Sequence, residues 1–125
     1  MAHTTQDFFK EYAAALLSFS AANITTFYKT PMAVYSDQGV QVVTKPQEVL
    51  AFWEEGLKPY AAQKITKAIP YVLTEERVSE TILVCKVFWE NYDDSDTQVS
   101  RETNHYILSE KDGGFSIVGL VITGA

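Results

Sequence analysis

The chain has 125 residues, 46% of them hydrophobic and 21% charged, and its formal net charge is −6. We expect residues 1–125 to form a single domain with one core, because a chain of this length buries roughly two-thirds of its unfolded surface around one centre. The acidic balance and the singly spread Lys and Arg residues argue against a nucleic-acid or anionic-membrane partner and favour a neutral or cationic partner or a second copy of the chain.

Two helices are predicted at the start of the chain. Thr4 or Thr5 can cap the first one, and Asp7 places a negative charge in its first turn. Apolar residues then recur at spacings of three and four as far as Phe19, which is typical of an amphipathic helix. A second, shorter helix is expected to begin at Asn23 and to end before Pro31.

A short hairpin and a third helix are predicted next. Residues 32–36 and 40–43 are expected to pair across a polar turn. Thr44, followed three residues later by Gln47, is typical of a capping box and predicts the start of a helix. Pro59 is expected to end that helix.

The second half of the chain is predicted to consist of strands. Residues 65–74 form the first of them, and Pro70 inside it indicates an edge position or a bulge. Residues 75–77 are expected to turn into a long hairpin of two strands, 81–92 and 97–108, which are joined by a polar run. A final apolar strand follows after a glycine-containing turn.

Three helices that mostly precede a series of antiparallel strands indicate an α+β fold, with the final strand over residues 115–123. We expect the helices to pack on one face of a strongly curved, mainly antiparallel sheet. A sheet that curls around a helix in this way forms a cone with an internal pocket. The pocket is where we expect a ligand to bind.

The long hairpin carries polar side chains on both faces, and these cost free energy unless they are paired or solvated. The register cannot be fixed from the sequence. If the hairpin loop has an odd length, then Arg101, Thr103 and His105 share the concave wall with Val87 and Trp89, and we adopt this arrangement as the prediction. The alternative register turns the other set of side chains inward: Glu102, Asn104 and Tyr106.

The chain resembles the nuclear transport factor 2-like superfamily over nearly its whole length. The resemblance is carried by the order of elements and by four short segments: EYAAAL at 11–16, TFY at 26–28, AVYSD at 33–37 and EKDGGF at 110–115. The superfamily includes ketosteroid isomerases, SnoaL-type polyketide cyclases, scytalone dehydratase and many pocket proteins of unknown role. Because one fold can host many functions, the resemblance implies the cone and its pocket rather than a reaction.

The resemblance to the ketosteroid isomerases implies three catalytic residues. Tyr12 stands where those enzymes carry a tyrosine that donates to the developing enolate oxygen, and Asp37 stands where they carry the aspartate base. His105 stands where they carry a protonated aspartate, and this departure matters because a histidine does not reproduce a carboxylic acid. Each residue also has a simpler interpretation: Asp37 suits a hairpin turn, and Tyr12 suits a helix face packed in the core.

We therefore predict a cofactor-independent pocket protein for a small, apolar carbonyl compound, working as an isomerase, cyclase or dehydratase by acid-base proton transfer. The predicted ligand-binding residues are Tyr28, Trp53, Trp89, Arg101 and Thr103. The alternative is a non-catalytic ligand-binding or dimerisation module of the same fold. Members of the superfamily commonly dimerise through the outer face of the sheet, so the resemblance also implies a homodimer.

No cofactor or metal is expected. The sequence contains no glycine-rich phosphate-binding loop, and neither histidine is spaced with carboxylates as metal ligands are. Cys85 is the single cysteine, which we expect to be a small buried hydrophobe rather than a nucleophile paired with His105. A lone cysteine, a start without a secretory signal and apolar runs too short to cross a bilayer predict a soluble protein of the reducing cytoplasm.

Overall fold

The computed structural model describes residues 4–123, which form three helices and a six-stranded sheet in the order β2-β1-β6-β5-β4-β3. The elements are α1 (Thr5–Leu17), α2 (Ala21–Thr25), β1 (Tyr28–Ser36), β2 (Gly39–Val43), α3 (Pro46–Ala62), β3 (Ile65–Arg77), β4 (Ile82–Asp93), β5 (Gln98–Lys111) and β6 (Gly114–Ile122). Only β1 and β6 pair in parallel. The predicted α+β class with a curved, mainly antiparallel sheet is confirmed.

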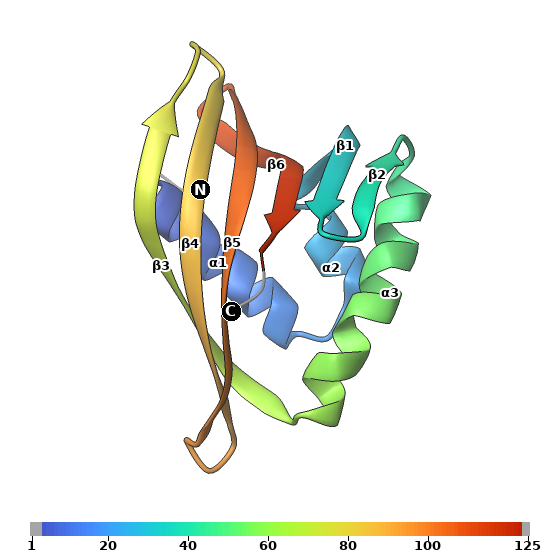
Figure 1. The fold of residues 1–125 in the computed structure, drawn as a ribbon, viewed down its shortest axis with the longest axis vertical. Helices are drawn as coiled ribbons and strands as arrows, with labels where there is room; N and C mark the ends of the chain where they lie inside the picture. Colours follow the sequence, from blue (N-terminus) through green and yellow to red (C-terminus); the bar gives the residue numbers. More distant parts are fainter. Residues whose placement is uncertain (1–3, 124–125) are drawn as a thin grey trace.

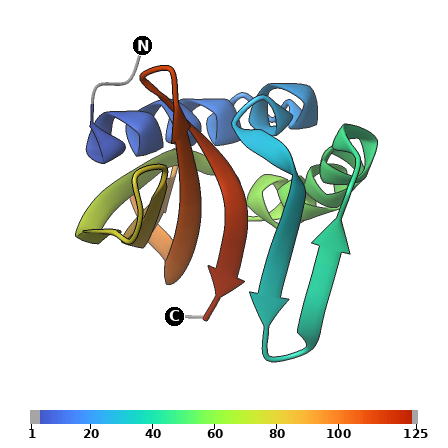
Figure 2. The ribbon, with the colours of Figure 1, turned by 90° about the horizontal axis from the view of Figure 1, so that it is seen from above.

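The helices lie against the curved sheet and leave its other face uncovered. In Figure 1, α1 crosses behind β3, β4 and β5, and α3 runs along the side of β2. Figure 2 shows the curvature from above, with α1 and α2 along one side of the sheet. No helix within residues 4–123 is both long and apolar enough to cross a membrane.

The first two helices begin at side-chain caps. Thr4 accepts a hydrogen bond of 3.0 Å from the backbone N–H of Asp7, which confirms Thr4 as one of the two predicted caps. The cap predicted at Asn23 is wrong. Ser20 caps α2 instead and accepts from the backbone N–H of Asn23 at 3.2 Å, so this helix begins earlier and has ended before β1 starts at Tyr28.

The third helix begins one residue later than predicted and does not end at Pro59. The Glu48 carboxylate accepts from the backbone N–H of Lys45 at 3.0 Å, so Glu48 takes the role that was predicted for Gln47. Pro59 lies inside the helix and removes one backbone donor. The helix continues because its following turn carries Tyr60 into contact with the sheet, where the Tyr60 hydroxyl bonds Glu102.

The strand β3 lies at the edge of the sheet, as Pro70 indicated, and a register shift between Val72 and Thr74 marks a bulge. The Gln6 side chain covers this edge: its amide donates to the Pro70 carbonyl at 2.9 Å and accepts from the Val72 N–H at 3.0 Å. The turn predicted at residues 75–77 is wrong. These residues continue β3, which pairs with β4 as far as Arg77, and the chain turns afterwards.

One face of the β4–β5 hairpin is buried, and it is the face opposite to the predicted one on β5. Along β4 the buried side chains alternate with half-buried ones, as expected for a strand covered mainly on one side. The buried set of this hairpin is Leu83, Cys85, Val87, Trp89, Asn91, Asn104, Tyr106 and Leu108. The apolar stripe of α1 packs against it and contributes Phe8, Phe9, Tyr12 and Leu16 to one core cluster.

Candidate functional site

A cavity of about 170 Å³ lies between α1, α3 and the concave face of the sheet. Two of the residues that line this cavity come from α1 and four come from α3. The others come from β4, β5 and β6. The lining residues are Tyr12, Leu16, Phe52, Trp53, Gly56, Tyr60, Trp89, Glu102, Asn104, Tyr106, Leu120 and Ile122. The predicted internal pocket is therefore present, and half of its lining side chains are aromatic.

Three hydrogen-bonded pairs hold the polar side chains of this cavity in place. The hydroxyls of Tyr12 and Tyr28 lie 2.6 Å apart, and the Trp89 indole donates to the Tyr106 hydroxyl at 3.0 Å. At the half-buried mouth, the Tyr60 hydroxyl donates to the Glu102 carboxylate at 3.2 Å. These pairs link α1 to β1, β4 to β5 and α3 to β5, so they orient the walls relative to one another.

Two buried polar atoms in the cavity wall have no hydrogen-bond partner among residues 4–123. They are the indole nitrogen Nε1 of Trp53, a donor, and the amide oxygen Oδ1 of Asn104, an acceptor. Trp53 is 9% exposed and Asn104 is 8% exposed, so bulk water does not reach them freely. Burial raises the pKa of Tyr28 overall, and the nearby Trp53 indole acts in the opposite direction, but the indole forms no hydrogen bond of ordinary geometry with the Tyr28 hydroxyl. A buried donor and acceptor left in this way cost free energy that a ligand can recover.

The phenols around the cavity are held in their neutral form. Burial is the largest cause that raises the pKa of Tyr12 and of Tyr106 well above the ordinary value, with neighbouring tyrosines as smaller causes. Burial also raises the pKa of Tyr28 to about 12. The pKa of Tyr60 is raised by burial first and by the Glu102 carboxylate second. At neutral pH these hydroxyls can donate hydrogen bonds.

Three of the predicted site residues line the cavity: Tyr12 from α1, Trp53 from α3 and Trp89 from β4. Tyr28 does not form part of the wall. It lies behind Tyr12 and contacts the cavity through the hydroxyl pair. Their assigned roles in catalysis and binding stay predictions, but the structure brings these four aromatic side chains together.

Asp37 lies away from the cavity. Strands β1 and β2 pair as far as Ser36 and Gly39, which leaves Asp37 and Gln38 as an exposed turn. Gly39 has a φ of 127°, a conformation that suits glycine at this tight turn. Asp37 is therefore not placed to act as the base in this cavity, as the resemblance to the isomerases implied, and the turn interpretation accounts for its position.

His105, Arg101 and Thr103 lie on the outer face of the sheet, so the predicted placement of this set on the concave wall is also wrong. The cause is a bulge: Asn91 pairs with Ser100 but the next residue, Tyr92, pairs with Gln98, which leaves Val99 as an extra residue. A one-residue insertion moves every side chain of β5 to the opposite face. His105 consequently pairs with Lys86 instead of sharing a face with Trp89.

The β5 residues that line the cavity are the ones that the alternative register turns inward, not the ones that we predicted. The inward set contains Glu102, Asn104 and Tyr106, which pair with Trp89, Val87 and Cys85. The sequence signal for this choice was the aromatic Tyr106 beside the apolar Leu108 in one alternating set. Tyr60 was missed because helix α3 was expected to stop at Pro59. Phe52 and Gly56 complete the wall from the same helix.

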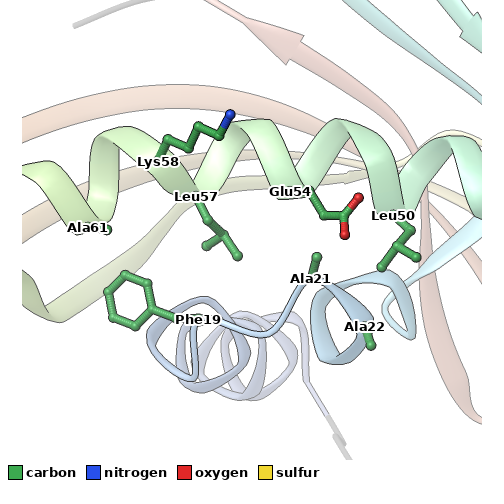
Figure 3. A pocket seen from close by; sticks show the side chains of 8 residues that line it. All are labelled: Phe19, Ala21, Ala22, Leu50, Glu54, Leu57, Lys58 and Ala61. Carbon is green, nitrogen blue, oxygen red and sulfur yellow. The ribbon is translucent and has the colours of Figure 1, made fainter.

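A larger but shallow groove of about 560 Å³ runs between α2 and α3 on the surface. Figure 3 shows that Leu50 and Leu57 project from α3 toward the segment that carries Phe19 and Ala21. The side chains around it are Phe19, Ala21, Ala22, Leu50, Glu54, Leu57, Lys58 and Ala61. Glu54 and Lys58, its two charged residues, are exposed, and none of its side chains carries an unpartnered buried polar atom within residues 4–123. The smaller cavity is the better candidate site, because its polar groups converge.

Metal binding and cysteine chemistry have no support in the part of the chain that the structure describes. Within residues 4–123 no group of three His, Cys, Asp or Glu side chains is placed to hold a metal ion. Cys85 is buried, and its burial raises the pKa of the thiol to about 11. His105 lies on the opposite face of the sheet, so it cannot activate this thiol.

The curved sheet, the three covering helices and the aromatic cavity define the class of pocketed α+β cone proteins. The family model described as NTF2-like protein (DUF6841) matches residues 3–125. The chain belongs to this family of NTF2-like proteins. A search of curated protein sequences found no similar protein.

Solved structures at low sequence identity share the fold. A domain of unknown function with a cystatin-like fold from Nostoc punctiforme matches with a TM-score of 0.74 and 15% identity, over 97% of this chain and 75% of that chain. A putative calcium/calmodulin-dependent protein kinase type II association domain from Thiobacillus denitrificans matches with a TM-score of 0.75 and 13% identity, over 98% and 95%. An NTF-2-like protein of unknown function from Shewanella oneidensis matches with a TM-score of 0.68 and 13% identity, over 92% of each chain.

Proposed function

We propose that this protein binds a small, largely apolar molecule, of about the size of one ring, in the aromatic cavity. The observation that carries the proposal is the pair of unpartnered buried atoms, Trp53 Nε1 and Asn104 Oδ1, in the wall of one cavity. A ligand with one acceptor and one donor satisfies both atoms. The volume of about 170 Å³ suits such a molecule, since a cavity of about 150 Å³ holds benzene.

Intrinsic fluorescence tests this function directly, because both tryptophans of the chain line the cavity. Benzamide carries a carbonyl acceptor and an N–H donor on a single ring, and toluene is a matched probe without polar groups. We expect saturable quenching by benzamide and weaker binding of toluene. If neither benzamide, benzyl alcohol nor toluene gives saturable binding by fluorescence or calorimetry, the cavity is not a binding site for molecules of this class.

Gly56 provides a substitution that narrows the cavity from within helix α3. A Cβ atom at position 56 would meet the Trp53 ring carbon Cε3 at 3.0 Å, so Gly56→Ala must displace the indole that forms the wall. Alanine in a helix interior is favoured over glycine by up to about 1 kcal/mol, which offsets the cost of shifting the indole, so we expect a thermal stability close to that of the natural protein. We expect benzamide affinity to fall about tenfold, or about 1.4 kcal/mol. Glu55→Ala on the exposed side of α3 is the control, and equal affinities for the two variants would contradict this role of Gly56.

A second function, acid-base catalysis on a small carbonyl compound, is favoured by the presence of a carboxylate and a phenol in the same cavity. Glu102 would be the base in place of the exposed Asp37, and Tyr12, positioned by Tyr28, would donate to an oxygen that gains charge. Deuterium exchange at the α-carbon of cyclohexanone, followed by NMR, tests this proposal. We expect the protein to accelerate exchange and Glu102→Gln to abolish the acceleration. Equal exchange rates with and without the protein would show that the protein does not catalyse enolisation.

The outer face of the sheet is proposed to form a twofold homodimer. The strand register places a row of small and apolar side chains across five strands, from Val42 on β2 through Ala33, Gly119 and Ile107 to Val84 on β4. Val40 and Val42 are each 63% exposed, so they add apolar area to this face. The outer face also carries His105 and Lys86, whereas Glu102 and Tyr106 belong to the cavity.

Light scattering at micromolar concentration tests this dimer. We expect a mass of two chains for the natural protein and of one chain for Val42→Glu, because a buried charge at an apolar contact is costly. Val78→Glu is the control, since Val78 is 54% exposed in the loop between β3 and β4 and lies outside the sheet. A mass of one chain for the natural protein would show that it does not form this dimer at micromolar concentration.

A further inference from the structure

The walls of the cavity favour positive charge. Six of its twelve lining residues are aromatic: Tyr12, Phe52, Trp53, Tyr60, Trp89 and Tyr106. Aromatic faces carry a negative quadrupole that attracts cations, and cages of several rings are a recurring way to recognise ammonium groups. Tyr12 packs edge-on against Trp53 and Trp89 at centroid distances of 6.4 Å and 6.1 Å, so these three lining residues form one aromatic cluster.

The charge of the lining points in the same direction. Glu102 is the one ionisable carboxyl group among the twelve lining residues, and none of those described residues is Lys, Arg or His. Tyr60 supplies a hydrogen bond of 3.2 Å to Glu102, but a carboxylate has about four acceptor sites, so acceptor capacity remains. The net charge of −6 adds a long-range attraction for cations and repels anions.

A second acceptor lies beside this carboxylate. Asn104 is two residues from Glu102 on the same face of β5, and its oxygen Oδ1 is buried without a donor. Side chains two residues apart on a strand are roughly 7 Å apart at their bases, which allows two flexible acceptors to reach one group between them. Glu102 at the half-buried mouth and Asn104 in the buried wall therefore offer two neighbouring acceptors, which an N–H-bearing cation satisfies.

We propose that the ligand of this cavity is a small protonated amine, with its ammonium N–H groups on Glu102 and Asn104, its apolar body among the aromatic rings, and an acceptor atom on that body toward Trp53 Nε1. The inference rests on the proposed binding function and specifies the chemical class of the ligand. A neutral alcohol can donate to Asn104 or accept from Trp53 Nε1, but it gains neither the ion pair nor the cation–π attraction. A carboxylate ligand would face Glu102 and is disfavoured by charge repulsion.

Three probes of nearly equal shape test the inference: benzylamine, benzyl alcohol and benzoate, titrated at neutral pH by calorimetry and by tryptophan fluorescence. We expect benzylamine to bind at least about tenfold more tightly than benzyl alcohol, and benzoate to bind least. If benzyl alcohol binds as tightly as benzylamine, the amine assignment fails while the binding function stands. If none of the three probes binds while benzamide or toluene does, the amine assignment fails alone; if benzamide and toluene also fail, the binding function fails with it.

Variants locate the source of the preference. Glu102→Gln keeps the size of the side chain and removes its charge, so we expect the preference for benzylamine over benzyl alcohol to fall to less than about threefold. Asn104→Leu removes the second acceptor and should weaken benzylamine binding in the same direction. Glu90→Gln is the matched control, because Glu90 bonds Tyr71 on the outer face. Circular dichroism checks that each variant is folded, and an unchanged preference in a folded Glu102→Gln variant would overturn the assignment.

Discussion

The protein is expected to unfold cooperatively when the pH rises above about 10, because its buried phenols cannot ionise in place. The pKa of Tyr12, Tyr28 and Tyr106 is raised mainly by burial, to about 12 for Tyr28. The pKa of Tyr60 is also raised, by burial first and by Glu102 second. Tyr60 contributes less to the pH dependence of stability because the cavity mouth is partly solvated. These tyrosines form the wall of the cavity and part of the core, so their protonation state is tied to the folded state.

The direction of the effect follows from proton binding. Above the ordinary phenol pKa of 10.0 the unfolded chain releases these protons, whereas the folded chain keeps them until its own raised pKa is reached. Stability is therefore complete below about pH 10 and is lost as the pH rises toward about 12. Each fully buried phenol contributes up to about 1.4 kcal/mol per pH unit. Three such groups can remove most of a total stability of about 5–15 kcal/mol within two units.

Urea unfolding at a series of pH values from about 8 to about 11 measures this loss, with tyrosinate absorbance recorded in parallel. We expect the urea midpoint to fall steeply above about pH 10, and the tyrosinate signal of the buried phenols to appear together with the loss of circular dichroism. Tyr28→Phe removes one of the titrating groups and should make the fall shallower. A midpoint that stays constant up to about pH 11 would show that these phenols ionise without unfolding.

The fold could be predicted from the sequence because its signals are local and repeated. The stripe that contains Phe9 and Leu16 recurs over three turns of helix, so an error at one position does not change the prediction. Caps and turns are less redundant. Ser20 and Asn23 are both good capping residues three positions apart, and the choice between them depends on where the chain must reach β1. Tertiary contacts also decide where α3 ends: the helix continues past Pro59, and the Tyr60 hydroxyl then reaches Glu102 on the sheet.

The site could be predicted only in part because one residue decides the face of a whole strand. Val99 is inserted opposite the junction of Asn91 and Tyr92, and nothing in its own character distinguishes a bulged valine from a paired one. Because of this insertion, Tyr106 faces the cavity and His105 faces the outside of the sheet. Tyr12 was placed correctly because the helix stripe fixes its direction independently of the sheet register.

The two tryptophans of the cavity are expected to differ in how much stability the protein loses when each is changed to phenylalanine. Trp89 is 1% exposed, donates to the Tyr106 hydroxyl and packs against Tyr12. Trp89→Phe breaks this hydrogen bond and leaves a void in a close-packed region, so we expect it to lower the free energy of unfolding by about 2–3 kcal/mol. Urea unfolding at neutral pH measures this loss.

Trp53 is nearly as buried, at 9% exposed, but its Nε1 donor has no partner, so the protein already bears the cost of that buried group. Removing an unpartnered donor recovers part of about 1–3 kcal/mol and offsets the lost packing, which predicts a stability change within about 1 kcal/mol for Trp53→Phe. The same variant should bind benzamide more weakly, because the donor that a ligand acceptor needs is gone. Equal destabilisation by both variants, with unchanged benzamide affinity for Trp53→Phe, would mean that Trp53 belongs to the core and not to a binding site.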